Sequence, residues 1–308
     1  MTTYHVPVLL KQSIEGLAIR PDGVYVDVTM GGGGHTRAIL NQLGAEGHLL
    51  GFDQDEAARA NVPEDSRFTF VHGNFRFLKN FLIYHGYPKV DGILADLGVS
   101  SHQFDTPERG FTFREAVRLD MRMNTKSPLT AAGIINTYDK ERLCLLFRDY
   151  GEIDNAGRLA ESLVRAREDQ AIETSMQLID AIKACTPKHA EYKYWAKVFQ
   201  ALRIEVNHEM ESLTALLEQS AEVLVTGGRL SVITYHSLED RLVKRFLRDG
   251  RFSGQAEKDL FGNALVPFRQ LSNKVTTPDE QEIADNPRAR SAKLRVAVKL
   301  EENHEAGI

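Results

Sequence analysis

The sequence has few cysteines, and this scarcity limits the metal and redox chemistry to expect. Its 308 residues include two, Cys144 and Cys185, which lie far apart and outside any CxxC pattern. Two isolated thiols provide neither a disulfide framework nor a typical zinc site. We therefore expect no metal, and the composition fits a protein of the reducing cytoplasm.

Long apolar runs are also absent. No stretch approaches the roughly 20 apolar residues that a bilayer-spanning helix needs, and residues 1–5 lack the basic-then-apolar pattern of a signal peptide. We expect a folded protein with no membrane partner. With 42% hydrophobic residues, the chain can bury the core of one large or two modest domains.

There is no excess of basic residues. A formal net charge of −5 and a pI of about 6.1 argue against a protein that coats nucleic acid through bulk electrostatics. Local basic surfaces are still available in the C-terminal third, although the helical spacing of the first group equally fits a solvated face. These residues are Arg241, Lys244, Arg245, Arg248 and Arg251, then Arg288, Arg290, Lys293 and Arg295.

Glycine, in contrast, is concentrated in one stretch. Three alternating valines at residues 24–28 lead into four consecutive glycines at 31–34, and an amphipathic helical pattern follows from Thr36 to Leu43. Glycines let backbone amides approach a ligand, and the free N–H groups of a helix start favour an electron-rich group. The stretch predicts a nucleotide-like cofactor over this turn.

The surrounding acids indicate which cofactor. A nicotinamide fingerprint needs a third glycine where Thr36 stands, and the first strand already carries Asp27. Asp53 lies 20 residues after Gly33, close to the spacing of an acid that accepts hydrogen bonds from ribose hydroxyls. Its alternative role is to cap the next helix. The pattern resembles the S-adenosylmethionine site of Rossmann-like methyltransferases.

Strand and helix patterns alternate through the first hundred residues. Expected strands at 24–28, 48–53, 68–72 and 90–97 are separated by short helices, which is typical of a parallel doubly wound α/β sheet. Ligands of such sheets lie beyond the carboxyl ends of the strands. We therefore expect Asp27, Asp53, Phe75 and Asp96 to line one crevice, with Phe75 either stacking on the adenine or serving as core.

The alternation then gives way to helices. Helical patterns cover 140–150, 155–168, 174–185 and 195–217. The sheet pattern resumes with a helix over 213–224 closed by Gly227-Gly228, a strand over 229–235, a helix over 238–248 capped by Ser237, and a final strand over 292–300. We therefore predict a cofactor-binding domain of residues 1–105 and 213–308, interrupted by a helical substrate-recognition domain of residues 106–212.

A second dense motif begins at the end of the fourth expected strand. Asp96 stands where methyltransferases of exocyclic amines place the group that accepts the amine N–H. The Pro-Pro-aromatic sequence that usually follows is missing. The residue that stacks on the target base is therefore open among Phe111, Tyr235 and His236, and Asp96 either acts on the amine or only orients the cofactor.

Seven ordered motifs together resemble one family, the bacterial small-subunit ribosomal RNA cytosine-N4 methyltransferases, over nearly the whole chain. They are Asp27-x-Thr29-x-Gly31-x-Gly33-Gly34-His35, Asp96-Leu97-Gly98-Val99-Ser100-Ser101, Arg109-Gly110-Phe111, Leu119-Asp120-Met121-Arg122-Met123, Phe199-Gln200-Ala201-Leu202-Arg203-Ile204, His236-Ser237-Leu238-Glu239-Asp240 and Asn286-Pro287-Arg288-Ala289-Arg290-Ser291.

The resemblance implies transfer of a methyl group from S-adenosylmethionine to the N4 amine of a cytosine in the decoding region, within the small ribosomal subunit or its RNA. The inserted domain would help to hold the RNA, and a homodimer is left open. The implied cofactor contacts are Gly33, Gly34, His35, Asp53, Phe75, Asp96 and Gln103. The expected substrate contacts are Arg203, Asn207, Tyr235 and His236 near the base and Arg288 and Arg290 at RNA phosphates.

Other functions fit parts of the same pattern. The same sheet supports a nicotinamide-dependent oxidoreductase, although the glycine spacing and Asp27 argue against it. A ribosome-assembly factor that keeps the fold without catalysis is disfavoured by the presence of both Asp53 and Asp96. DNA in place of RNA is a further alternative substrate within the methyltransferase class. The acidic balance favours a preorganised ribonucleoprotein surface over free RNA as the substrate.

Overall fold

The structure is a computed structural model that describes residues 7–259 and 261–301. The expectation for residues 1–5 lies outside this part. The described residues form two compact units, one containing the chain up to Gly98 and from Glu211 onward, the other Val99–Met210. These borders fall at 98/99 and 210/211, whereas the predicted domain borders are 105/106 and 212/213.

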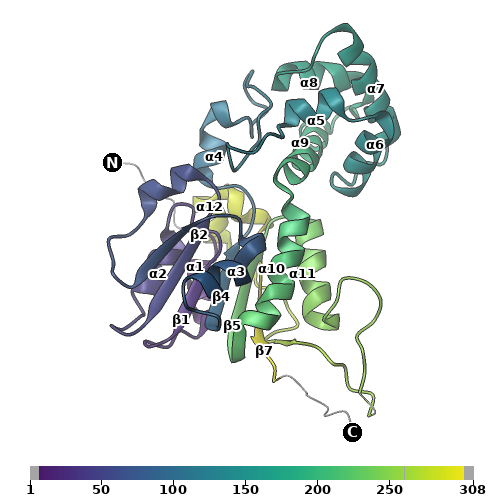
Figure 1. Cartoon of the computed structure of the whole chain (residues 1–308). Coiled ribbons are helices and arrows are strands. Elements are labelled where there is room, and N and C mark those ends of the chain that lie inside the picture. The colour runs from purple at the N-terminus through teal and green to yellow at the C-terminus, as the bar shows by residue number, and fades with distance from the viewer. Residues whose placement is uncertain (1–6, 260, 302–308) are drawn as a thin grey trace. The chain divides into compact units, whose positions relative to one another are not determined.

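The first unit is built on a seven-stranded sheet of order β3-β2-β1-β4-β5-β7-β6. Its strands are β1 Val24–Asp27, β2 His48–Asp53, β3 Phe68–His72, β4 Val90–Asp96, β5 Leu224–Thr234, β6 Phe268–Gln270 and β7 Lys293–Lys299 (Figure 1). The order 3-2-1-4-5 confirms the doubly wound α/β fold.

The parallel pairing expected for the first four strands is confirmed, but the final strand runs antiparallel, and β6 lies in a segment where no strand was expected. β7 runs antiparallel to β5, and β6 runs antiparallel to β7. The apolar alternation of a strand records which face is buried but not the direction of the strand, so the sequence pattern of residues 292–300 gave no sign of this reversal.

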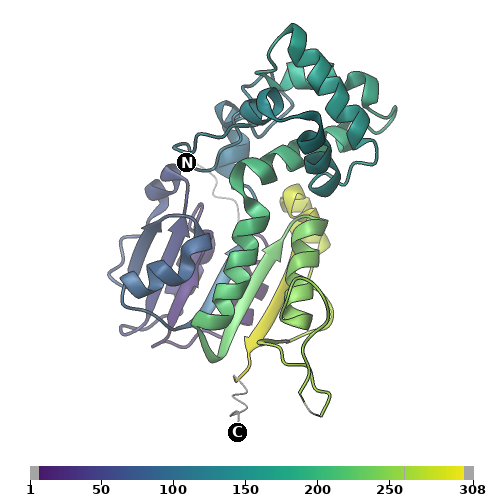
Figure 2. The same ribbon diagram turned by 45° about the vertical axis from the view of Figure 1, so that its right-hand side comes forward.

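Helices cover both faces of this sheet. Helices α1 Leu10–Leu17 and α2 Gly34–Leu40 pack on the face that carries Tyr25, Leu49 and Leu94. On the opposite face, Phe81 of α3 Leu78–Tyr84 packs edge-on against Phe52, with ring centroids 5.7 Å apart. Figure 2 shows α3, α10 Glu209–Val223 and α11 Ser237–Asp249 along that face. The carboxyl ends of β1, β2 and β4 therefore lie at one edge of a rigid layer.

Two local expectations near β5 are corrected. Helix α10 ends at Val223, and β5 starts at Leu224, so the Gly227-Gly228 pair lies within the strand and not between the helix and the strand. Gly227 has a positive φ of 82°, and the pairing of β5 with β4 shifts register here. The N-cap of α11 is His236 and not Ser237, because the His236 ring accepts the N–H of Glu239.

The second unit is helical. Its helices are α4 Ser101–Asp105, α5 Ala131–Thr137, α6 Lys140–Asp149, α7 Ala156–Asp169, α8 Ser175–Ile182 and α9 Glu191–Asn207. They enclose a separate apolar core that includes Phe147, Leu159 and Leu202. The helix expected over 195–217 is interrupted, since His208 takes a left-handed conformation with φ 50° between α9 and α10. Within the described ranges, no helix is both long and apolar enough to cross a bilayer.

We predict that the first unit depends on the apolar packing of β4. Ile93 is fully buried, so Ile93→Ala should lower the free energy of unfolding by about 2–5 kcal/mol, through lost burial and the cavity left behind. Urea unfolding followed by circular dichroism measures this. Ile83→Ala is the matched control, because Ile83 is 57% exposed in the same unit. Equal unfolding midpoints for the two variants would contradict the prediction.

Candidate active site

Residues 28–33 form the turn that joins β1 to α2. The N–H of Val28 donates to the carbonyl of Leu94 at 2.9 Å, and the N–H of Met30 donates to that of Phe52 at 2.9 Å. The turn is thus attached to both strands that flank β1. Gly31 and Gly33 have positive φ angles of 47° and 75°, which a residue with a Cβ adopts at a cost. The helix begins at Gly34 and not at Thr36.

Gly34 has a different reason for being glycine. A Cβ at this position would lie 2.1 Å from Cγ of Pro7. Pro7, in the chain segment before α1, therefore occupies the space that a side chain at position 34 would need. Ring atoms cannot move away as easily as the end of a flexible side chain, so the close packing of Pro7 alone requires glycine here.

Asp53 ends β2 beside the glycine turn. Its Oδ2 accepts the N–H of Gly31 at 2.8 Å, and its Oδ1 accepts the N–H of Asp55 at 2.8 Å. Burial raises the pKa of this carboxyl. The alternative role as a helix cap is excluded, because Asp55 caps the following 3-10 helix Glu56–Asn61 by accepting the N–H of Ala57. Each Asp53 oxygen keeps a further lone pair for hydroxyl donors.

Asp27 does not line the crevice as expected, because its side chain is fully buried. Its Oδ1 accepts the N–H of Thr29 at 3.0 Å, and its Oδ2 accepts the hydroxyl of Thr36 at 2.7 Å. Burial raises the pKa of Asp27 to about 6, against the lowering effect of these hydrogen bonds. Asp27 therefore fixes the glycine turn and the start of α2 from inside.

Asp96 ends β4 and connects to three elements. Its N–H donates to the Thr29 hydroxyl at 2.7 Å, and its Oδ1 accepts the Tyr235 hydroxyl at 2.8 Å. Its Oδ2 lies 3.7 Å from Nδ1 of His35, the second residue of α2. The two oxygens are thus differentiated: Oδ1 is held by a phenol, and Oδ2 faces an imidazole.

The charges at this cluster follow from burial. Burial raises the pKa of Asp96 to about 7, the Tyr235 hydrogen bond opposes the rise, and the charges of Asp27 and Glu239 add to it. Burial lowers the pKa of His35 to about 4. Tyr235 has a pKa far above its usual range through burial and the nearby Asp96 charge. At neutral pH, His35 is therefore uncharged, Tyr235 is a donor, and Asp96 is close to its titration midpoint.

Glu239 holds Tyr235 and His236 in place. Its Oε2 accepts the N–H of Tyr235 at 2.8 Å and that of His236 at 3.3 Å. The His236 ring in turn caps α11, and its Nε2 lies 3.1 Å from Oε1 of the buried Glu239. His236, expected near the base, thus has a structural role that orients the segment carrying Tyr235.

The other predicted residues of the first unit lie on short 3-10 helices. Phe75 begins Phe75–Phe77, directly after β3, and is half-buried. Arg288 and Arg290 are exposed on Pro287–Ser291, where the buried Ala289 between them anchors the turn. An exposed pair of arginines on an anchored turn suits contact with phosphate groups.

Gln103 and Phe111 belong to the second unit. Gln103 is buried, and its side chain forms a capping box with Ser100 at the start of α4. Phe111 is buried in the helical core and packs 6.5 Å from the ring of Phe104. A buried ring has no free face on which a base could stack. The base-stacking role of Phe111 therefore stays a prediction that the burial of its ring does not support.

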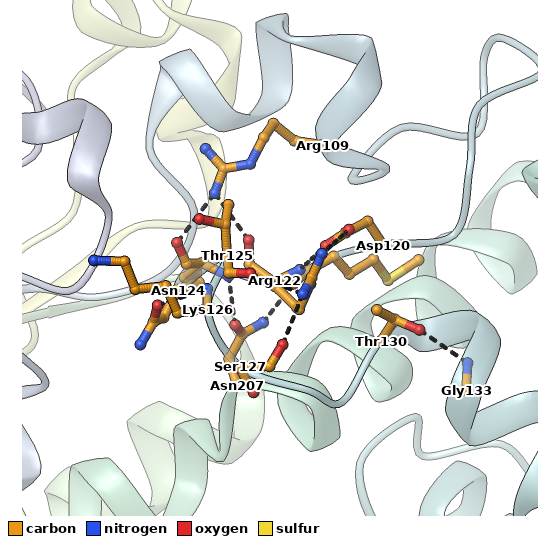
Figure 3. A network of polar contacts seen from close by, with 12 residues as sticks. Arg109, Asp120, Arg122, Asn124, Thr125, Lys126, Ser127, Thr130, Gly133 and Asn207 are labelled. Atoms are coloured by element: carbon orange, nitrogen blue, oxygen red, sulfur yellow. Dashed lines mark hydrogen bonds and ion pairs between the residues drawn. The ribbon is translucent and has the colours of Figure 1, made fainter.

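Arg203 and Asn207 already have partners within the second unit. The guanidinium of Arg203 donates to both carboxylate oxygens of Glu209, each at 2.8 Å. Asn207 accepts the N–H of Met123 at 2.7 Å and donates to the carbonyl of Met121 at 2.8 Å (Figure 3). The geometry indicates that Asn207 fastens α9 to the loop of residues 118–130.

The same loop is held by residues to which the sequence assigned no separate role. Figure 3 shows the guanidinium of Arg109 directed at the loop, where it donates to the carbonyls of Arg122 and Met123 at 2.8 and 3.1 Å. Arg122 forms a two-pronged ion pair with Asp120. Gly110 is required beside them, since a Cβ there would lie 2.3 Å from the carbonyl of Arg118.

Two residues of the active-site cluster stand in the motifs quoted above, but the sequence reasoning gave them no role. Thr29 carries the hydroxyl that accepts the N–H of Asp96, and no sequence pattern marks such a contact between β1 and β4. The position of Glu239, in contrast, could have been recognised from the sequence. A capping residue followed three positions later by glutamate is a helix-start signature, here with histidine in place of serine or threonine.

A doubly wound sheet, a glycine turn after β1 and acids at the ends of β2 and β4 define a Rossmann-like methyltransferase. The chain belongs to the MraW methylase family, whose model matches residues 2–300. It is thus a methyltransferase enzyme with S-adenosylmethionine as methyl donor, as the family resemblance of its motifs implied.

Close relatives cover almost the same length. The chain is 58% identical over 297 residues to ribosomal RNA small subunit methyltransferase H of Bacteroides thetaiotaomicron, covering 96% of this chain and 98% of the relative. It is 54% identical over 303 residues to the protein of that name from Flavobacterium johnsoniae, covering 97% and 100%. A solved putative rRNA-methylase from Clostridium thermocellum is 14% identical, with a TM-score of 0.45 and coverage of 97% and 100%.

The buried Asp27 predicts a pH-dependent stability. Because its pKa is about 6 in the folded protein, above about 4 in the unfolded chain, the stability that it contributes is present at low pH and lost as pH rises from about 4 to 6. Asparagine does not ionise. The stability of Asp27→Asn relative to wild type should therefore increase by roughly 1–3 kcal/mol from pH 4 to pH 7.

Urea unfolding at several pH values measures this difference. Asp22→Asn serves as the control, since the side chain of Asp22 is 75% exposed, and its difference from wild type should stay flat. A flat difference for Asp27→Asn as well would show that Asp27 does not carry the expected burial cost.

Proposed function

We propose that this protein transfers a methyl group from S-adenosylmethionine to the N4 amine of a cytosine in the decoding region of small-subunit ribosomal RNA, in the cytoplasm. The observation that carries the proposal is Asp96 at the end of β4, with one oxygen held by Tyr235 and the other directed at a neutral His35. The names of the relatives support the RNA, and the family resemblance supports the cytosine amine.

The donors and acceptors around the glycine turn fit the cofactor. Asp53 offers carboxylate lone pairs at the end of β2, where ribose hydroxyls would donate, and Gly31 and Gly33 place no Cβ atoms in the second half of the turn. The His35 ring lies beside this edge of the sheet, with Nδ1 3.7 Å from Oδ2 of Asp96, and it also has a hydrogen bond with the backbone of Val8. When bound, the cofactor supplies a methyl group already activated by its sulfonium charge.

Asp96 is the residue proposed to act on the amine. The lone pair of a cytosine N4 amine is delocalised into the ring, so the nitrogen is a poor nucleophile. An N–H that donates to Oδ2 of Asp96 places electron density on the nitrogen and gives the proton a place to go once the new N–C bond forms. A carboxylate with a pKa of about 7 is a stronger base than an ordinary aspartate.

The neighbours of Asp96 keep this base effective. A charged His35 would hold the Asp96 carboxylate ionised and weaken it as a base, but burial keeps His35 neutral. Tyr235 occupies Oδ1 and thereby directs Oδ2 toward the incoming amine. Thr29 fixes the backbone of Asp96 through its hydroxyl. Positioning of this kind supplies much of the rate in a displacement reaction.

The first prediction concerns the reaction itself. Small ribosomal subunits that lack the modification should receive labelled methyl groups, recovered as N4-methylcytidine by nucleoside analysis. Asp96→Asn keeps the shape but not the base, and should lower kcat by about 100- to 10,000-fold. The exposed variant Asp22→Asn should match wild type. Label in another nucleoside, or label in DNA offered in parallel, would refute the assigned acceptor.

The same variant separates the two roles of Asp96. Binding of S-adenosylmethionine to Asp96→Asn, measured by calorimetry, should stay within a few-fold of wild type if Asp96 acts on the amine. A loss of binding as large as the loss of kcat would assign Asp96 to cofactor orientation instead. Undiminished cellular function of Asp96→Asn would favour an assembly factor that uses the fold without catalysis.

The pH dependence of the methylation rate tests the role of Asp96 as a base. Asp96 can accept a proton from the amine only when its carboxylate is ionised. The methylation rate should therefore rise with pH through about 7 and level off above it. Tyr235→Phe keeps the ring but removes a hydrogen bond that lowers the pKa of Asp96, so the rising limb should move to higher pH. Tyr84→Phe, at an 82% exposed tyrosine, should leave the profile unchanged. An unshifted profile in Tyr235→Phe would contradict this role of the phenol.

A further inference from the structure

Four aromatic side chains cluster around the first turns of α9 in the second unit. The ring of Phe113 lies 6.5 Å from Tyr192, 6.2 Å from Trp195 and 5.1 Å from Phe199, and the rings of Tyr192 and Trp195 are 5.4 Å apart. Positions 192, 195 and 199 share one helix face. The cluster therefore combines one face of α9 with the loop that carries Phe113.

The fold explains only part of this cluster. Phe199 is buried in the helical core, and Phe113 and Trp195 pack against that core while partly exposed. Tyr192, in contrast, is 73% exposed. Apolar burial does not account for a tyrosine whose ring is mostly in solvent. The outer rings form an aromatic surface made of Phe113, Tyr192 and Trp195.

The orientation of this surface is fixed from beneath. The indole N–H of Trp195 donates to the hydroxyl of Thr186 at 3.3 Å, and that hydroxyl donates to the carbonyl of Ile182 at 3.1 Å. Phe199 supports Phe113 from the core side, with the two rings inclined at 64°. The rings of Trp195 and Phe113 thus need little ordering when a flat partner stacks on them.

The segment that carries Tyr192 and Trp195 is rich in lysine, whereas the segment that carries Phe113 has one exposed cation, Arg114, and one exposed acid, Glu115. Residues 183–197 contain four lysines and a single acid, Glu191, although the whole chain carries a net charge of −5. Lys188 and Lys193 are exposed on either side of the start of α9, and the exposed Arg114 follows Phe113 directly. Aromatic rings beside exposed cations are the combination that proteins use to bind single-stranded nucleic acids.

We propose that Phe113, Tyr192 and Trp195 form a stacking platform for unpaired bases of the RNA substrate, while Arg114, Lys188 and Lys193 contact the neighbouring phosphates. The inference rests on the proposed function, because that function supplies an RNA substrate. The mixture of cations and exposed rings favours RNA over a protein partner, whose contact surface would exclude charges from its centre. Unpaired bases are favoured because a base within a duplex has no free face to stack.

Trp195 is the only tryptophan of the chain and provides the assay. Titration of the full-length protein with a single-stranded oligoribonucleotide should quench its fluorescence. Tyr192→Ala should weaken that binding by about tenfold, since one base stack on an aromatic ring is typically worth this much or more. Tyr192→Phe should restore most of the affinity. Tyr84→Ala, at an exposed tyrosine of the first unit, is the matched control and should bind as wild type does.

Salt tests the electrostatic part of the proposal. Lys193→Glu should weaken binding at low salt and reduce the dependence of affinity on salt concentration, whereas Lys11→Glu, at a strongly exposed lysine of the first unit, should not. A duplex of the same sequence should bind more weakly and quench less. Equal affinity of Tyr192→Ala and wild type for the single strand, or a fluorescence unaffected by it, would overturn the proposal.

The outcome is separable from that of the proposed function. If wild type methylates ribosomal subunits while Tyr192→Ala does so with unchanged KM and kcat, the platform is refuted and the reaction stands. If subunits accept no methyl group but the single strand still quenches Trp195 and depends on Tyr192, the platform stands and the assigned reaction is refuted.

Discussion

The active site depends on the carboxylate of Asp27, which is fully buried and does not line the cofactor crevice. The carboxylate of Asp27 accepts hydrogen bonds from the backbone N–H of Thr29 and the hydroxyl of Thr36. The hydroxyl oxygen of Thr29 in turn accepts a hydrogen bond from the N–H of Asp96. The side chain of Asp27 thereby holds three chain segments in place. It binds the glycine turn and the start of α2 directly, and it holds the end of β4 through Thr29. The burial that raises the pKa of Asp27 also destabilises its charge, so this arrangement costs stability in return for geometry.

The sequence predicts this fold well where local patterns decide it. β2 and β3 have the expected bounds, because alternating apolar residues between turn signals leave little freedom. The antiparallel direction of β7 and the break at His208 could not be read in this way. Strand direction depends on partners distant in sequence, and the helical pattern continues through residue 208 without a glycine or proline.

Some residues of the candidate site could be predicted from the sequence, and the roles of others could not. Asp53 and Asp96 follow strands, so the general rule for parallel sheets places them at the ligand edge. Asn207, Arg203 and His236 are polar residues in recognisable motifs, yet their side chains bind other parts of the chain. A motif contains structural and functional residues alike. Only the contacts tell a residue that holds the scaffold from one that faces the substrate.

The strand order also has a consequence for how the chain folds during synthesis. The helical unit is one continuous segment, Val99–Met210, and has its own core, so all its contacts are available once residue 210 has been made. The sheet is different, because β7 lies between β5 and β6 and is the last strand to be made. Until β7 is synthesised, β6 has no neighbour and β5 presents an open edge. The first strands can pair with one another before then, but the open edge of β5 is closed only by the last strand, and this edge is the point at which a nascent chain is most prone to mispairing.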